Sequence, residues 1–330
     1  IDADVLDAGV LYLKITALSY PFLALYNAGA ALFRSMGNSK ISMQISVLMN
    51  IINIVGNAVC IFGLKMGVDG VAWPSVVSRV IAAVLILGRC YQKGHALTVP
   101  KTVKLDTGMA KRILGIGVPS TVMIAISSLM YYLFNLVLGR FNAVEFGLGE
   151  TGTTVFGVYY KLQSFIFMPV FGINNALLAI CAYNYGARLP KRITGTIRCG
   201  VLAASTLMLI GVVIFELLPA QLLGFFNADE AMLRVGEPAL RILASQFMLA
   251  GTSIIFSGAF QGLGKSIYSM YISLARQLIV LIPVAFLLSM QGNIDLVWLS
   301  FPIAEAVSLA LSALMLGRLN RKMIRPLGNL

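Results

Sequence analysis

The chain has 330 residues, of which 58% are hydrophobic and 12% charged, and its formal net charge is +12. Soluble domains carry about 25% charged residues, so this composition excludes an ordinary soluble protein and indicates a polytopic membrane protein. The four cysteines lack pairing or metal-ligand spacing and there is one histidine, His95, so we expect no disulfide framework, zinc site or cofactor.

Nine apolar stretches separated by short polar loops predict membrane-spanning helices. They cover residues 10–33, 41–63, 70–91, 113–138, 153–182, 194–219, 236–260, 268–290 and 295–317. In lipid each span must satisfy its own backbone hydrogen bonds, so the predicted fold class is all-α.

The basic residues are unevenly distributed between the two sides of the membrane. Alternating the loops places 17 of the 25 Lys and Arg on one side, where Asp106 is the one acid. The positive-inside rule makes this side, and the tail from Arg318, cytoplasmic. Such a distribution indicates topology and contact with anionic lipid rather than a nucleic-acid partner. We expect a multi-pass protein of the inner membrane, monomeric, with membrane lipid as a partner and no nucleic acid.

The first span contains an internal repeat. Residues Gly9 to Ser46 recur as Gly236 to Ser273, a shift of 227 positions with 11 of 38 identical. Parallel repeats of membrane helices are a recurring transporter plan. Since the chain starts with Ile1 and residues 113–219 have no earlier counterpart, the repeat predicts an N-terminally truncated protein that lacks three of twelve helices.

The same repeat predicts the domain boundaries. Residues 1–91 form a partial N-terminal lobe with helices four to six, and residues 113–330 form a C-terminal lobe with helices seven to twelve. The polar stretch 92–112 is the expected cytoplasmic linker between them.

Polar residues inside the early spans are the first candidates for a transport cavity. Pro21 interrupts the first span and frees a backbone carbonyl. In the second span Asn50, Asn53 and Asn57 share one helix face. These amides either pack helices through hydrogen bonds or form a polar cavity wall. Arg79, near the centre of the third span, should face protein or water rather than lipid.

The fourth and fifth spans add aromatic and amide side chains. Tyr131 and Asn135 lie four positions apart on the fourth span. The fifth span carries Gln163, Asn174 and Asn175 deep within its apolar stretch. Their position within an apolar span makes them cavity candidates. Lys161, on the same span, either reaches toward the outer interface or contributes to the cavity.

One carboxylate lies inside the last spans. Glu305 sits in the middle of its helix and Arg276 lies in the preceding one, while Gln246 is a further polar candidate. An intramembrane acid is a functional candidate, since leaving it unpaired costs several kcal/mol. An ion pair with Arg276 and a role in coupling to H⁺ or Na⁺ both remain open.

Several motifs in chain order carry a family resemblance. They are Phe33-Arg34-Ser35-Met36-Gly37-Asn38, Gly117-Val118-Pro119, Asn184-Tyr185-Gly186-Ala187 and Phe260-Gln261-Gly262-Leu263-Gly264. Together they resemble the bacterial multidrug and toxic compound extrusion (MATE) family over essentially the whole chain. The resemblance implies two pseudo-twofold-related six-helix lobes in a V shape and export of organic cations and drugs against inward flow of protons or sodium.

The resemblance also exposes departures. Where one branch of the family has an asparagine and, four positions on, an aspartate, this chain has Asn53 and Asn57. The acids of the sodium-coupled branch match Ser127 and the Gly251–Thr252 region. The coupling acid is therefore either Glu305 or a residue of the helices predicted to precede Ile1.

These observations lead to one functional hypothesis and one alternative. The leading hypothesis is a cation-coupled antiporter that exports drugs and toxic compounds by alternating access. The alternative is a flippase of the same superfamily for lipid-linked oligosaccharides or peptidoglycan precursors, which needs several basic cavity residues. No nucleotide-binding motif or convergent catalytic constellation is present, so an enzyme is not expected.

Overall fold

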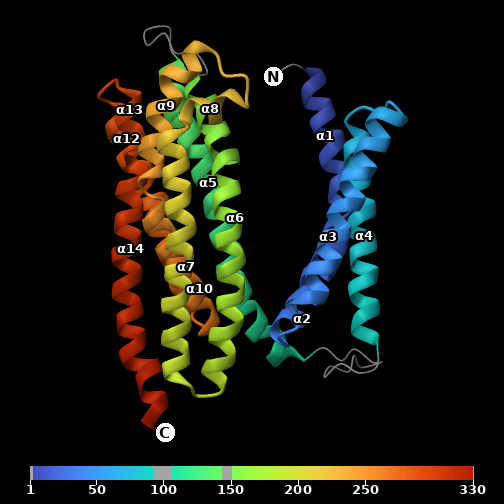
Figure 1. Cartoon of the computed structure of the whole chain (residues 1–330), viewed down its shortest axis with the longest axis vertical. Coiled ribbons are helices and arrows are strands. Elements are labelled where there is room, and N and C mark those ends of the chain that lie inside the picture. Colours follow the sequence, from blue (N-terminus) through green and yellow to red (C-terminus); the bar gives the residue numbers. More distant parts are fainter. Residues whose placement is uncertain (1–2, 93–105, 143–150, 330) are drawn as a thin grey trace. The chain divides into compact units, whose positions relative to one another are not determined.

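The computed structural model describes residues 3–92, 106–142 and 151–329, and all of these segments are helical or connect helices (Figure 1). The chain folds as two compact units, residues 1–105 and 106–330. Unit 1 contains α1 (Ala3–Ala17), α2 (Tyr20–Ser35), α3 (Ser39–Ala58), the π-helical segment η1 (Val59–Gly63) and α4 (Asp69–Tyr91). The predicted all-α fold is confirmed for the described residues.

Unit 2 is larger and holds the remaining helices. These are α5 (Thr107–Gly139), η2 (Arg140–Asn142), α6 (Thr151–Gly186), α7 (Pro190–Leu217), α8 (Pro219–Gly224), α9 (Glu230–Ala244), α10 (Phe247–Gly262), α11 (Ser266–Leu274), η4 (Ala275–Leu281), α12 (Ile282–Ser289), α13 (Ile294–Trp298), α14 (Ser300–Leu319), η5 (Asn320–Ile324) and η6 (Arg325–Asn329). The segment η4 is π-helical and joins α11 and α12 into one span, Ser266–Ser289.

The predicted number of spans agrees with the structure. Among the described residues, seven helices are long and apolar enough to cross a membrane, or nine when each of two bent helix pairs counts as one span. The predicted linker, residues 92–112, needs one correction: α5 already begins at Thr107, because the Asp106 carboxylate accepts hydrogen bonds from the amides of Gly108 and Met109 and caps the helix. Residues 93–105 of that linker lie outside the described part of the chain. The lobe boundaries themselves remain a prediction.

The internal repeat is visible in the helix boundaries. Shifting α1 and α2 by 227 positions reproduces the bounds of α9 and α10, and the two pairs bend by 47° and 48°. At each bend a serine hydroxyl, of Ser19 or Ser245, donates to the carbonyl three residues earlier, and this local bond accompanies the end of the first half-helix. Two units of the chain thus contain the same broken span.

The turn after each broken span also repeats. Gly37 and Gly264 adopt φ values of +78° and +72°. This left-handed conformation is open to glycine at little cost, so the glycines end α2 and α10 and start the next helices at equivalent positions.

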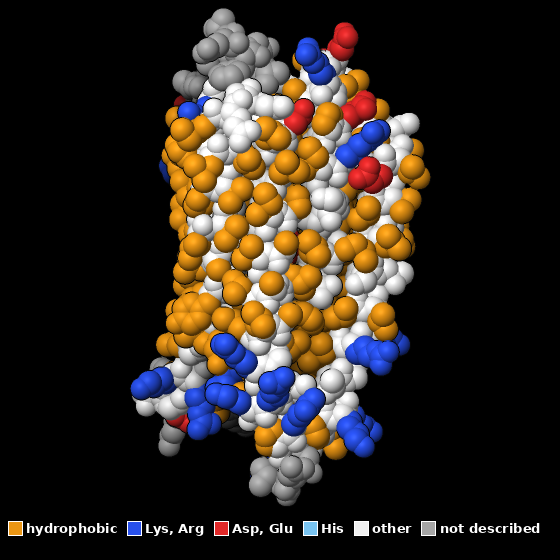
Figure 2. Space-filling model, turned by 90° about the vertical axis from the view of Figure 1, so that its left-hand side faces the viewer, with side chains coloured by type: hydrophobic (Ala, Val, Ile, Leu, Met, Phe, Trp, Pro, Cys, Tyr) orange, Lys and Arg blue, Asp and Glu red, His pale blue; other side chains and the backbone are white. Residues whose placement is uncertain are grey.

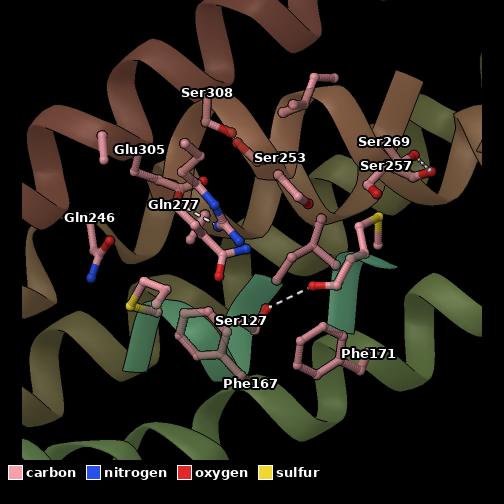
Figure 3. Close-up of a pocket in the computed structure, with 18 of the residues that line it drawn as sticks. Ser127, Phe167, Phe171, Gln246, Ser253, Ser257, Ser269, Gln277, Glu305 and Ser308 are labelled. Atoms are coloured by element: carbon pink, nitrogen blue, oxygen red, sulfur yellow. Dashed lines mark hydrogen bonds and ion pairs between the residues drawn. The ribbon is translucent and has the colours of Figure 1, made fainter. Parts of the chain in front are cut away.

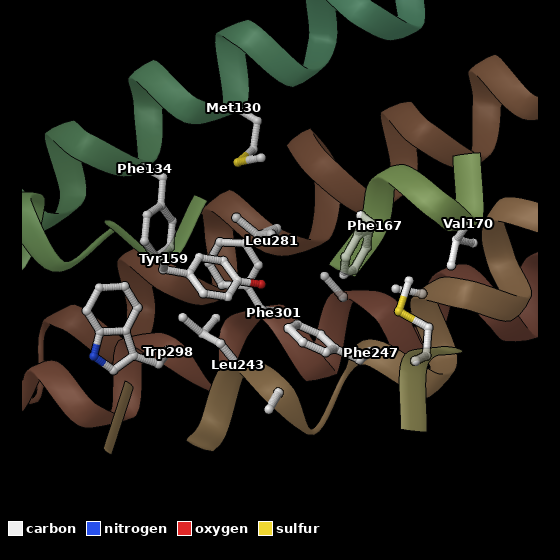
Figure 4. Close-up of a cluster of buried hydrophobic side chains, with 14 of the residues drawn as sticks. Met130, Phe134, Tyr159, Phe167, Val170, Leu243, Phe247, Leu281, Trp298 and Phe301 are labelled. Atoms are coloured by element: carbon white, nitrogen blue, oxygen red, sulfur yellow. The ribbon is translucent and has the colours of Figure 1, made fainter. Parts of the chain in front are cut away.

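The hydrophobic core of unit 2 lies between α5, α6, α9, α10 and α14 (Figure 4). Phe134 of α5 packs against Phe156 of α6 and Phe301 of α14, with ring centroids 4.6 and 4.9 Å apart. Tyr159 and Trp298 are fully buried beside them. These rings hold together the helices that form the cavity described next.

Candidate functional site

Unit 2 contains a cavity of about 520 Å³. Its walls come from α5, α6, α10, the span of α11 and η4, and α14. Figure 3 shows Phe167 and Phe171 of α6 on one side, with Ser253 of α10 and Glu305 and Ser308 of α14 across from them. A volume of this size lies in the range of small-molecule sites, which run from roughly 300 to 1,000 Å³.

An ion pair lies in the cavity wall. Arg276 Nη1 is 2.8 Å from Glu305 Oε2. No other salt bridge is found among the described residues. The Glu305 side chain is 3% exposed, whereas that of Arg276 is 28% exposed. The carboxylate is therefore almost fully removed from solvent, and the guanidinium reaches it from the open part of the cavity.

Glu305 retains an unused acceptor. Its Oε1 is buried and has no hydrogen-bond partner among the described residues. The Ser253 hydroxyl and the Asn174 amide oxygen, which belong to the same lining, are also buried without a described partner. Buried polar groups normally have hydrogen-bond partners. These three groups are therefore available to form hydrogen bonds with a molecule bound in the cavity, in addition to the ion pair.

Local helix geometry positions Arg276. This residue is the second of η4, and Gln277, which follows it, is buried in the cavity wall. A π-helical turn contains an extra residue, which rotates the following side chains relative to an α-helix, and such turns are frequent at functional sites. The π-helical segment thus sets the angle from which Arg276 meets α14.

The bend between α9 and α10 positions a second polar contact. Gln246 occupies the break and is 5% exposed. Its Nε2 donates to the Tyr159 hydroxyl on α6 over 3.1 Å. The amide therefore satisfies a fully buried phenol while it lines one end of the cavity (Figure 3).

Asn174 contacts α10 closely. A Cβ added to Gly258 would overlap the Asn174 amide oxygen, so glycine at this position is what allows the side chain to lie against the helix. Asn174 lines the cavity from there.

Comparison with known proteins places this geometry in a family. The MatE family model matches residues 2–59 and 119–287, well over half of the chain and parts of both units. The chain belongs to the MatE family. The resemblance predicted from the sequence motifs is therefore confirmed.

The MatE relatives include bacterial proteins with names that describe drug resistance. The probable multidrug resistance protein YoeA of Bacillus subtilis is 26% identical over 318 residues, which cover 93% of this chain and 67% of that protein. The multidrug export protein MepA of Staphylococcus haemolyticus is 25% identical over 299 residues, covering 90% of this chain and 64% of MepA. This chain thus spans about two-thirds of the length of these relatives.

Solved MatE-type structures share the fold. An outward-facing multidrug resistance MATE family transporter of the MOP superfamily matches all of this chain and 72% of that protein, with 20% identity and a TM-score of 0.89. A MOP superfamily transporter from Pyrococcus furiosus, described as having a binding pocket of reverse polarity, matches 97% of this chain and 70% of that protein, with 22% identity and a TM-score of 0.86.

The cavity brings together five of the eleven candidates from the sequence. These are Gln163, Asn174, Gln246, Arg276 and Glu305. Tyr131 and Asn135 of α5 and Asn175 of α6 lie outside its lining. Asn135 donates to the Tyr131 carbonyl of its own helix, and Tyr131 stacks on Phe156 at 5.1 Å.

The asparagines of α3 belong to unit 1 and are described there alone. Asn53 donates to the Ser75 hydroxyl of α4 at 3.0 Å, and Asn57 donates to Asn53 at 3.3 Å. Asn50 donates to the carbonyl of Ser46 in its own helix. Of the two readings of this amide face, the contacts within unit 1 favour helix packing for Asn53.

The two other cations that the sequence analysis singled out lie elsewhere. Arg79 of α4 donates to the Ser19 hydroxyl at the bend of the first broken span. Lys161 is exposed, and its ammonium lies 5.6 Å from the centre of the Phe226 ring. Neither residue lines the cavity of unit 2.

Several cavity residues were missed by sequence reasoning. Ser253 and Ser257 are four residues apart on α10, and Ser308 follows Glu305 by three positions on α14. Their helical spacing from one another or from the candidate acid is a signal that could have identified them. Gln277 gave no comparable signal, because η4 departs from the α-helical period.

Proposed function

We propose that this protein exports organic cations and drugs across the inner membrane by alternating access, coupled to inward movement of H⁺ or Na⁺. The observation that carries the proposal is the cavity of unit 2, whose lining combines aromatic side chains with one buried carboxylate, Glu305, paired to Arg276. Apolar walls accept varied organic molecules, while one charged group provides a point for ion coupling. The drug-related names of the YoeA and MepA relatives support the same function.

The ion pair suggests how coupling works. With Glu305 ionised, the pair has no net charge, so the cavity tolerates an organic cation. A proton on Glu305 leaves Arg276 uncompensated and raises the charge of the site by one. At about 5 Å and an effective dielectric constant of about 20, repulsion between Arg276 and a bound cation is about 3 kcal/mol. This lowers affinity by roughly two orders of magnitude.

The direction of this effect is the one that an exporter needs. A proton that enters from outside displaces the drug, and its loss to the cytoplasm restores the site. When one more positive charge enters than leaves in a cycle, its movement through 100 mV supplies about 2.3 kcal/mol. A gradient of one pH unit adds about 1.4 kcal/mol. Sodium at the free Glu305 oxygen would act through the same change in charge.

The flippase alternative predicts a different cavity. A diphosphate-linked substrate needs several cationic groups that are free to bind phosphate. In the described part of unit 2 the cavity lining holds one cation, Arg276, and Glu305 already neutralises it. These charges favour drug export over diphosphate-lipid transport.

The two functions are separated by a cellular assay. Cells that produce the protein should accumulate less ethidium and fluoroquinolone than cells with an empty vector, and collapse of the ion gradients should remove the difference. Unchanged drug accumulation together with rescue of a flippase-deficient strain would refute export.

A further inference from the structure

A second hollow lies at the end of unit 2 where α14 finishes. It has a volume of about 320 Å³ and is lined by Lys265, Tyr268, Met315, Arg318, Leu319, Lys322 and Met323. Lys265 precedes α11, and the others belong to α11, α14 and η5. This basic pocket is separate from the cavity that contains Glu305, since the two linings share no residue.

Among its described lining residues, the pocket holds three positive charges and no acid. Lys265, Arg318 and Lys322 form no salt bridge or side-chain hydrogen bond within the described residues. Arg318 and Lys322 are four residues apart on consecutive helical segments, so they occupy neighbouring positions, and Lys265 adds a cation from the turn before α11. Like charges around one hollow repel one another, and a bound anion would remove that repulsion.

The remaining wall is apolar. Tyr268, Met315, Leu319 and Met323 line the pocket beside the three cations. Residues next to it in the sequence are apolar and exposed, with Ile267 at 42% and Leu314 at 64% exposure, on spans that would face hydrocarbon. Exposed apolar side chains thus lie next to lining residues of the pocket on the same two spans.

The position along the molecule matches a membrane interface. Figure 2 shows an apolar band over the middle of the displayed face and Lys and Arg side chains gathered toward the end at which α14 finishes. Anionic lipids attract basic residues at this depth, and basic pockets between membrane helices are suited to their headgroups.

We propose that this pocket binds the phosphate of an anionic phospholipid headgroup, with Lys265, Arg318 and Lys322 as its cationic ligands. The acyl chains then lie along the exposed apolar surface near Ile267 and Leu314. A soluble phosphate compound would use the cations but gain nothing from that surface, so the combination favours lipid.

The test is native mass spectrometry of the protein in a neutral detergent, titrated with phosphatidylglycerol. The pocket variant is Lys265→Gln/Arg318→Gln/Lys322→Gln. The matched control, Lys191→Gln/Arg192→Gln/Arg198→Gln, removes the same charge from exposed positions at the start of α7. Binding of the first phosphatidylglycerol should weaken about fivefold for each charge removed from the pocket. The control variant should leave that affinity unchanged.

Parallel titrations identify the source of the phosphate. Phosphatidylcholine should show no dependence on the pocket residues, and inorganic phosphate should fail to displace phosphatidylglycerol. Equal losses in the pocket and control variants would overturn the proposal, as would inorganic phosphate binding as tightly as the lipid. The single variant Lys322→Gln, at an exposed position, keeps the test valid if the triple variant does not fold.

Discussion

The ion pair predicts an asymmetric effect of removing either partner. Changing Arg276 to Met leaves Glu305, which is 3% exposed, as an uncompensated buried charge. Breaking a buried pair in this way typically costs about 3–5 kcal/mol. Because Arg276 itself is 28% exposed, we take the lower end, about 3 kcal/mol. Glu305→Leu should cost less, since the guanidinium that remains can reach water in the cavity.

The double variant tests whether the two charges depend on each other. Arg276→Met/Glu305→Leu replaces both charges by apolar groups, a change that is often neutral for a buried pair, so it should be more stable than Arg276→Met alone. Thermal unfolding in detergent measures this, and the single variant should melt several degrees lower, at roughly 2–4 °C per kcal/mol.

The outcome that refutes this reasoning is additivity. If the double variant loses the sum of the two single losses, the two side chains do not depend on each other. The same conclusion follows if Arg276→Met has the same melting temperature as the parent protein.

Two further predictions concern glycines and one the cavity wall. Gly258→Ala should destabilise the protein by about 1–3 kcal/mol through overlap with Asn174, and adding Asn174→Ala should recover most of that loss in thermal melting. Gly264→Ala should destabilise the protein by roughly 1–2 kcal/mol, because the φ of Gly264 is +72°. The control Gly88→Ala should not destabilise it, because a Cβ added there meets open space. Equal melting temperatures of the two variants would contradict this prediction. Phe171→Ala, at a position 47% exposed, should weaken drug binding in a fluorescence titration without lowering the melting temperature, and unchanged affinity would remove Phe171 from the site.

The order of spans and the repeat could be predicted from sequence because both depend on patterns along the chain. Apolar stretches of sufficient length gave nine spans, and the match of Gly37 with Gly264 gave equivalent turns. The bend at Ser245 and Gln246 was not predicted, since α10 has no proline corresponding to Pro21.

The sequence predicted part of the candidate site, and charged residues were identified more readily than amides or hydroxyls. Glu305 and Arg276 were found because charges inside a span are costly and need partners. Asn135 and Asn175 were equally polar but lie outside the cavity lining, because polarity of a residue does not fix which side of a long helix faces a cavity. Ser253 and Ser308 were missed since a hydroxyl can bond within its own helix and therefore carries a weaker signal.

The central claim, ion coupling through Glu305, is tested most directly in proteoliposomes. Uptake of ethidium should be driven by an imposed pH or Na⁺ gradient in the parent protein and in the control Glu216→Gln, which alters an exposed acid at the end of α7. Glu305→Gln should abolish gradient-driven uptake and, because the uncharged glutamine leaves Arg276 uncompensated, weaken ethidium binding by roughly two orders of magnitude. Gradient-driven uptake by Glu305→Gln at the parent rate would contradict the account.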